Sequence, residues 1–263
     1  MQLFVVGPPR SGLTIVTQFL NHHQDIKIFD EIDLIQVGTF GESLIGTLRD
    51  FLVERGAYDA FQHGARYNAD PAVALQAVMS EIVRPRTIWG EKNPVYATRL
   101  DALRRRFPDA VLLFVLRDPR EVVNSCLLYR DSPLRTPTDF WIKDTVTDAL
   151  TLVERSLEPL DGGGAGLVAL RYEDFVARPK ATLDAAFRRW GLTFSDSAVP
   201  LAHSSPETVG DNQFFRHGAP LPWKVGNLSP LRQAPPARDR LDAGDPAWAR
   251  VDALARRFGY DRV

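Results

Sequence analysis

The chain has 263 residues, of which 44% are hydrophobic and 25% charged, and its formal net charge at pH 7 is −1. These values are typical of a globular protein, and the balanced charge excludes an overall basic field that would attract nucleic acid or an anionic membrane. The single cysteine, Cys126, excludes an intrachain disulfide and a metal site built from several cysteines. No apolar run approaches the roughly 20 residues that span a bilayer, and the N-terminal run is too short for a signal peptide. We therefore expect a cytoplasmic protein with neither a membrane nor a nucleic-acid partner.

The start of the chain predicts a strand, a loop and a helix. Residues 2–6 are a short apolar run, which is typical of a buried strand, and residues 15–22 place their apolar side chains on one helical face. The loop between them, residues 7–14, is rich in glycine and proline. Its amides, together with those of the helix N-terminus, can surround an anion.

This loop has the spacing of a Walker A loop but lacks its lysine. Gly7, Gly12 and Thr14 stand at the expected positions, whereas Leu13 occupies the position of the lysine and the cation lies inside the loop, at Arg10. A nucleoside triphosphatase needs that lysine on the β- and γ-phosphates and a hydroxyl on Mg²⁺. The loop is better suited to a terminal phosphate that carries its transferable group without a metal.

Residues 9–14, Pro-Arg-Ser-Gly-Leu-Thr, resemble the 5′-phosphosulfate loop of the sulfotransferases that depend on 3′-phosphoadenosine 5′-phosphosulfate (PAPS). The family pattern is roughly P-[KR]-[SA]-G-T-T, and this chain departs from it at Leu13. The resemblance implies that the cofactor's 5′ end is bound by Arg10, Ser11, Gly12, Leu13 and Thr14, and that Arg10 also takes part in catalysis.

An acidic cluster follows the second predicted strand, residues 26–29. The cluster contains Asp30, Glu31 and Asp33, and acidic residues here are also consistent with the first turn of a helix. In the tyrosylprotein sulfotransferases, which the chain resembles, a catalytic glutamate follows the loop arginine by twenty-one residues. That spacing, counted from Arg10, selects Glu31 as the general base and leaves Asp30 and Asp33 as alternatives.

Two less regular regions are predicted to cover the acceptor side of the site, residues 37–86 and 130–145. The first has helical faces over residues 44–52 and 72–83, with a polar and aromatic loop at residues 61–67 between them. Specificity for the acceptor is expected to lie in these regions.

A third strand, residues 87–89, leads into Gly-Glu-Lys-Asn-Pro at residues 90–94, and a helix is predicted over residues 96–107. This motif resembles a segment common in bacterial and tyrosylprotein-type sulfotransferases. The resemblance implies that Lys92 reaches the transferring group. The alternative for Lys92 is a solvated surface lysine.

Residues 111–116 form a continuous apolar run, which is typical of a central strand covered on both faces. Arg117 follows directly, Pro119 starts a helix, and Ser125 lies eight residues after Arg117. The combination resembles the 3′-phosphate motif of sulfotransferases. Arg117 would give a forked donor to the phosphate and Ser125 a hydroxyl.

The next segments predict a long amphipathic helix over residues 140–157, a flexible turn at residues 161–166 and a strand over residues 167–170. Tyr172, which follows that strand, resembles the family's adenine-side tyrosine. A further helix starts at Pro179.

Residues 214–218 and 222–228 resemble the C-terminal segment that closes over PAPS in cytosolic sulfotransferases, and residues 205–232 are therefore predicted to be the cofactor-closing loop. His217 replaces the usual lysine, which makes one contact weaker or dependent on pH. The resemblance implies cofactor contacts by Phe214, Arg216, His217 and Gly218. A final helix is predicted over residues 248–258.

These elements together predict an α/β fold: a single P-loop-like domain over residues 1–263, with a central, mostly parallel sheet flanked by helices. All the motifs except the last follow predicted strands. The ends of parallel strands meet at one edge of such a sheet, where α/β folds bind ligands.

The resemblance implies transfer of a sulfuryl group from PAPS to a hydroxyl or amine, which releases 3′-phosphoadenosine 5′-phosphate (PAP), with Glu31, Arg10 and Lys92 as catalytic residues and no metal. The acceptor is expected to be a small molecule, a carbohydrate or a peptide. One alternative is a P-loop nucleotide kinase or triphosphatase with an altered Walker A loop, although Arg117 crowds its Walker B candidate, Asp118. The other is a PAP-binding module without catalysis.

Overall fold

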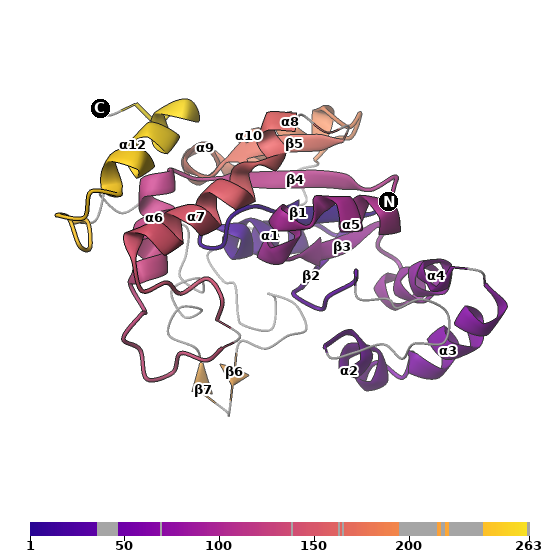
Figure 1. Ribbon diagram of the computed structural model, residues 1–263. Coiled ribbons are helices and arrows are strands. Elements are labelled where there is room, and N and C mark those ends of the chain that lie inside the picture. The colour runs from indigo at the N-terminus through magenta and orange to yellow at the C-terminus, as the bar shows by residue number, and fades with distance from the viewer. Residues whose placement is uncertain are drawn as a thin grey trace.

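The computed structural model describes residues 1–35, 47–68, 70–137, 139–162, 164, 166–194, 215–216, 219–220 and 239–261. Its centre is a five-stranded sheet (Figure 1). The strands are β1 (Leu3–Val6), β2 (Ile26–Asp30), β3 (Ile88–Lys92), β4 (Val111–Leu116) and β5 (Leu167–Arg171). Their order is β2-β3-β1-β4-β5, and every neighbouring pair is parallel. The predicted α/β class and the parallel central sheet are confirmed.

Helices cover both faces of this sheet. One face packs against α1 (Leu13–Asn21), α9 (Tyr172–Ala177) and α10 (Pro179–Arg188). The other packs against the 3₁₀ helix η1 (Pro94–Thr98), α5 (Leu100–Arg106), α6 (Pro119–Leu127), α7 (Val146–Leu157) and α12 (Trp248–Arg257). A short helix, α8 (Pro159–Gly162), precedes β5, and β6 (Phe215–Arg216) pairs antiparallel with β7 (Ala219–Pro220).

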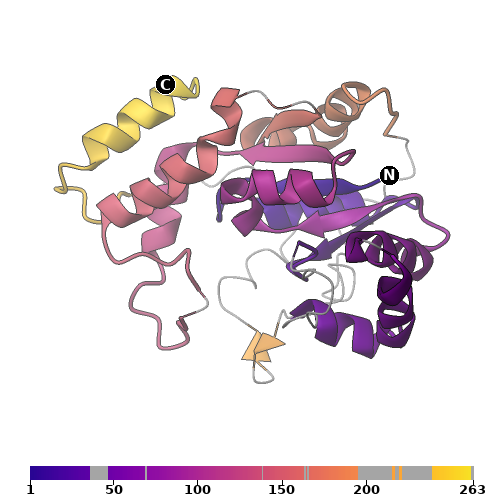
Figure 2. The same cartoon turned by 45° about the vertical axis from the view of Figure 1, so that its right-hand side comes forward.

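Three further helices, α2 (Thr47–Glu54), α3 (Tyr58–Tyr67) and α4 (Pro71–Val83), form a separate group. Figures 1 and 2 show this group on the opposite side of the molecule from α6, α7 and α12. Its apolar side chains join the same core as the sheet, for example through the ring of Phe51 against Phe29 of β2, with ring centroids 5.0 Å apart.

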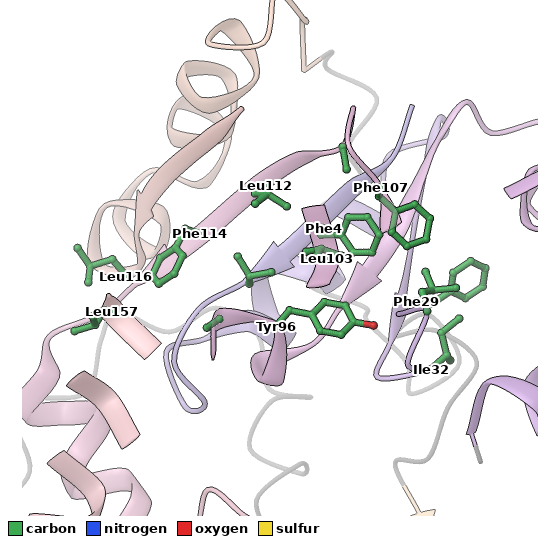
Figure 3. Packing of buried hydrophobic residues seen from close by; sticks show 14 of the residues in the cluster. Phe4, Phe29, Ile32, Tyr96, Leu103, Phe107, Leu112, Phe114, Leu116 and Leu157 are labelled. Carbon is green, nitrogen blue, oxygen red and sulfur yellow. The ribbon is translucent and has the colours of Figure 1, made fainter. Parts of the chain in front are cut away.

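The alternation of side chains along the strands explains why both faces are buried. In β4, Leu113 and Val115 pack in the cluster under α1, whereas Leu112, Phe114 and Leu116 pack in the cluster on the opposite face. Figure 3 shows this second cluster, in which Phe4 of β1 lies beside Tyr96 of η1 and Leu103 of α5, whereas Phe114 of β4 lies on the side of Leu157 in α7. The continuous apolar run is therefore the central strand that the sequence predicts.

The predicted loop at residues 61–67 is wrong, because these residues belong to helix α3. Phe61 is buried in the core, and Gly64 allows α3 to approach α4, since a Cβ atom there would lie 3.0 Å from that of Ala74. Glycine is a weak helix former in isolation, so the tertiary contact decides the structure.

Two other predictions of helix length are also wrong. The helix predicted over residues 96–107 is divided at Arg99 into η1 and α5. The helix predicted over residues 140–157 begins only at Val146, because Thr145 is its N-cap and accepts a hydrogen bond from the amide of Asp148.

Candidate active site

The loop after β1 has the backbone of an anion site. Gly7, Arg10 and Gly12 have φ of 147°, 70° and 98°, and α1 begins directly afterwards with no side-chain cap. The first amides of a helix have no partner within the helix, so they are available to an anion. The buried hydroxyl oxygen of Ser11 has no hydrogen-bond partner among the described residues.

Arg10 joins this loop to α6 and to the connection between α6 and α7. Its Nε donates to the hydroxyl oxygen of Ser125 in α6 at 3.1 Å. Its guanidinium carbon lies 4.7 Å from the ring centroid of Trp141 and 5.9 Å from that of Tyr129. The sequence does not indicate either aromatic residue as part of the site. Trp141 falls within the helix predicted over residues 140–157, whereas in the structure it lies in the connection before α7.

Arg117 and Tyr172 lie against the same loop. Nη1 of Arg117 donates to the carbonyl oxygen of Arg10 at 3.2 Å, and its guanidinium carbon lies 4.9 Å from the Tyr172 ring centroid. The Tyr172 ring covers Gly12 so closely that a Cβ atom there would lie 2.3 Å from the ring. Burial raises the pKa of Tyr172, although Arg117 opposes the shift. The structure thus brings together residues that stand far apart in the sequence.

The start of α6 beside this cluster is held by Glu173, Arg120 and Tyr260, which the sequence did not indicate. Glu173 accepts the amide of Asp118 at 3.0 Å and the hydroxyl of Tyr260 at 2.9 Å. The carboxylate of Asp118 accepts from Arg120 at distances of 2.6–3.0 Å and caps α6. Asp118, the Walker B candidate, is therefore used in holding the first turn of α6.

A second cluster lies at the ends of β2 and β3. The ammonium of Lys92 donates to Glu31 Oε1 at 2.6 Å and pairs with the carboxylate of Asp30. The side chains of Asp30 and Lys92 are each 2% exposed, whereas that of Glu31 is 43% exposed. Burial alone would lower the pKa of Lys92, but the two carboxylates outweigh it and raise this pKa. The alternative of a solvated surface lysine is wrong, because β3 extends to Lys92 and buries it.

Asp33, the other alternative for the general base, interacts with Asn93 and not with Lys92. Its Oδ1 accepts from Asn93 Nδ2 at 3.0 Å. Burial raises the pKa of Asp33, with a further contribution from the nearby Glu31. Of the three acidic residues, Glu31 is exposed, Asp33 is half-buried and Asp30 is buried.

The remaining candidates are placed as follows. Leu13 has its side chain in the core under α1, so only its backbone faces the loop. Phe214, His217, Gly218 and the side chain of Arg216 lie outside the described residues, as do most of residues 205–232. Within the described ranges, no group of three or more His, Cys, Asp or Glu residues has an arrangement that could hold a metal ion. No helix among the described residues is both long and apolar enough to cross a membrane.

Comparison with known structures identifies the same fold. The sulfotransferase domain of the Synechococcus PCC 7002 olefin synthase superposes with a TM-score of 0.68 at 18% identity, over 100% of this chain and 96% of that one. The sulfotransferase domain of the curacin biosynthetic pathway gives 0.61 at 14% identity, over 99% and 98%. At these identities the likeness shows the fold alone.

Two curated proteins are similar in sequence. Protein-tyrosine sulfotransferase 2 of Gallus gallus is 24% identical over 209 residues, which are 75% of this chain and 53% of that protein. Omega-hydroxy-beta-dihydromenaquinone-9 sulfotransferase Stf3 of Mycobacterium bovis is 31% identical over 120 residues, or 41% of this chain and 30% of that protein. The chain thus spans about half the length of the first relative and less of the second.

The model of the sulfotransferase family matches residues 2–196, a range that contains both clusters and all five strands of the sheet. The match covers most of the chain, and the fold agrees with it. The chain therefore belongs to the sulfotransferase family.

Proposed function

We propose that this protein is a PAPS-dependent sulfotransferase, which transfers a sulfuryl group to a hydroxyl or amine of an acceptor and releases PAP. The observation that carries the proposal is the meeting of Arg10, Ser125, Arg117 and Tyr172 around the loop after β1, in a chain of this family.

The described residues fit PAPS as the donor. The loop offers uncapped helix amides and a buried hydroxyl without a described partner, and two guanidinium groups adjoin it. The lysine that a triphosphate requires is absent. When bound, PAPS would supply the sulfuryl group, and the chain would supply position and charge.

On the donor side, the 5′ end would be held by Arg10, by the hydroxyls of Ser11 and Thr14, and by the amides of Gly12 and Leu13. Arg117 and Ser125 would bind the 3′-phosphate, which ATP lacks. Tyr172 would lie against the adenine. The family resemblance adds Phe214, Arg216, His217 and Gly218 to this set, within a closing loop at residues 205–232.

On the acceptor side, Glu31 would accept the proton of the acceptor hydroxyl. Its exposure supports this choice over Asp30, which is buried with Lys92, and over Asp33, which is held by Asn93. Lys92 would act on the transferring sulfuryl group beside Glu31, to which its ammonium donates. General base catalysis of this kind is worth about 10²–10⁴ in rate.

We extend the proposal to the organisation of the whole chain. Residues 37–86 and 130–145 would cover the acceptor, and residues 1–263 would form one domain. The acceptor would be a small molecule, a carbohydrate or a peptide, and a cytoplasmic location stays a prediction from the sequence. The tyrosine and menaquinone acceptors in the relatives' names belong to those proteins.

The nucleotide kinase or triphosphatase and the PAP-binding module without catalysis are less well supported. The first needs a lysine after Gly12 and an available Walker B carboxylate, whereas Asp118 is bound by Arg120. The second leaves the ion-paired cluster of Glu31 and Lys92 without a role.

The test is a transfer assay with ³⁵S-labelled PAPS and a panel of tyrosine peptides, oligosaccharides, phenols and hydroxylated lipids. The expected result is a labelled product and one PAP for each transfer, without added Mg²⁺. Tight PAP binding with no transfer to any acceptor would favour the non-catalytic module, and Mg²⁺-dependent release of phosphate from ATP would favour the triphosphatase.

A further inference from the structure

The segment that carries the proposed base has an unusual backbone. Glu31 and Asp33, in the loop at residues 31–35 after β2, have φ of 56° and 62°. Residues other than glycine adopt this left-handed conformation only when their surroundings hold them in it. Contacts with the rest of the protein must therefore hold the backbone of this loop in place.

Glu91 of β3 binds two backbone amides of this loop. Its side chain is fully buried and lies beside the end of β2, where Glu91 pairs with Phe29. Its Oε1 accepts the amide of Asp33, and its Oε2 accepts the amide of Leu34, both at 2.8 Å. One carboxylate therefore binds two consecutive amides of the loop.

Two side chains complete the coordination of Glu91. Asn93 Nδ2 donates to Oε1 at 3.1 Å, and the hydroxyl of Tyr96 donates to Oε2 at 2.5 Å. Figure 3 shows the Tyr96 hydroxyl directed toward the side of the cluster where Phe29 and Ile32 lie. All four partners donate to the two oxygens of Glu91, and an amide at this place would put a nitrogen that cannot accept where one of those oxygens lies.

The rest of the loop is fixed from the same strand and from the core. The amide of Glu31 donates to the carbonyl oxygen of Lys92 at 2.9 Å, and the amide of Ile35 donates to the Tyr96 hydroxyl at 3.3 Å. Ile32 and Leu34 are buried in the core, which leaves Glu31 and Asp33 to point away from it.

We propose that Glu91 is a positioning residue for Glu31: its carboxyl group fixes the loop at residues 31–35 in the conformation that pairs the exposed Glu31 with Lys92. The proposal rests on the proposed function, in which Glu31 is the base. Glu91 is fully buried and would touch neither the donor nor the acceptor. Its effect would therefore fall on turnover and not on cofactor binding.

The test is the Glu91→Gln variant, which keeps the shape of the side chain but replaces one accepting oxygen with an NH2 group that cannot accept from the donors around it. We expect kcat at saturating PAPS to fall at least about tenfold, with the KM for PAPS and the Kd for PAP within about twofold of the wild-type values. Amide hydrogen exchange should rise at residues 31–35 and stay unchanged in α1 and β4.

Asp252→Asn is the matched control, because Asp252 is a largely buried carboxylate paired with Arg240 and lies outside both clusters. It should leave kcat and exchange at residues 31–35 unchanged. If Glu91→Gln does not fold, Tyr96→Phe removes one donor to Glu91 and the acceptor of the Ile35 amide, and it should give a smaller change in the same direction.

Wild-type kcat in Glu91→Gln, or unchanged exchange at residues 31–35, would overturn the proposal. A loss of PAP affinity equal to the loss of kcat would also overturn it, since it would indicate general damage to the site. If the wild-type protein binds PAP but transfers nothing, the proposed function fails. The exchange measurement still decides, by itself, whether Glu91 holds the loop.

Discussion

Glu31 differs from its acidic neighbours in what surrounds it. It is ion-paired with Lys92 and partly exposed, whereas Asp30 is buried on the same lysine. We predict that Glu31→Gln lowers kcat about 10²–10⁴-fold, because a neutral amide cannot accept the acceptor's proton, while the Kd for PAP stays within about twofold. Steady-state kinetics and calorimetry measure the two quantities. Asp33→Asn serves as the comparison, and a larger loss of turnover in that variant would make Asp33 the base.

The buried carboxyl group of Glu91 makes the free energy of unfolding depend on pH. Burial raises its pKa from 4.5 to about 7, against the opposing effect of its hydrogen bonds from Tyr96, Leu34, Asp33 and Asn93. Between these two values the folded state binds more protons than the unfolded state, so the free energy of unfolding should fall as pH rises through this window. The fall due to Glu91 would be about 3 kcal/mol at most.

Urea unfolding of the wild type and Glu91→Gln from pH 4.5 to 7.5 checks this prediction. The difference between the two proteins isolates the contribution of residue 91. A difference that stays flat, or that favours the wild type increasingly as pH rises, would contradict it.

The roles of single residues were only partly predictable from the sequence. Arg10, Arg117 and Tyr172 each follow a strand with a recognisable motif, and for that reason the sequence predicts that they lie together, as they do in the structure. The sequence does not predict a role for Glu91, because the motif at residues 90–94 points to Lys92. A single charged residue next to a short predicted strand does not reveal that four donors surround it. Those donors come from the loop at residues 31–35, from Asn93 and from Tyr96 of η1.

At the scale of elements, the connection between α6 and α7 turns back onto the loop after β1. Trp141 and Ile142 form a small cluster there with Tyr129, and the face of Trp141 lies against the Arg10 guanidinium. We predict that Trp141→Leu weakens PAP binding about 2- to 30-fold, the range that corresponds to a cation–π contact of roughly 0.5–2 kcal/mol. Calorimetry measures the change. The control is Trp190→Leu, which removes an aromatic residue after α10, and equal effects of the two variants would argue against a specific contact with Arg10.

The elements themselves were predicted well where burial on both faces leaves a clear pattern. The strands β1 and β4 are continuous apolar runs, and both lie where the sequence places them. The errors occurred where a tertiary contact outweighs the local pattern. Gly64 lies within a helix because α4 packs against it, and Trp141 lies outside one because Thr145 caps α7.

At the scale of the whole molecule, residues 258–260 near the C-terminus hold the segments that carry Arg117 and Tyr172. The Tyr260 hydroxyl donates to Glu173, which holds the amide of Asp118, and Arg171 donates to the carbonyl oxygens of Phe258 and Gly259. We predict that Tyr260→Phe lowers the free energy of unfolding by about 1–2 kcal/mol, because a partly buried carboxylate loses a donor. Thermal unfolding checks this value, and an unchanged Tm would show that Glu173 is satisfied without Tyr260.

In the proposed function, one site binds a nucleotide that carries phosphates at both the 3′ and the 5′ position of its ribose. Calorimetry with PAP, ADP and ATP, each with and without Mg²⁺, on the wild type and on Arg117→Ala tests it most directly. We predict that PAP binds without metal and at least about tenfold more tightly than ADP. The reason is that the charge-assisted contact of Arg117 with the 3′-phosphate is worth roughly 1.5–3 kcal/mol. Arg117→Ala should therefore remove this preference. Equal affinity for PAP and ADP, or tighter Mg²⁺-dependent binding of ATP, would contradict the claim.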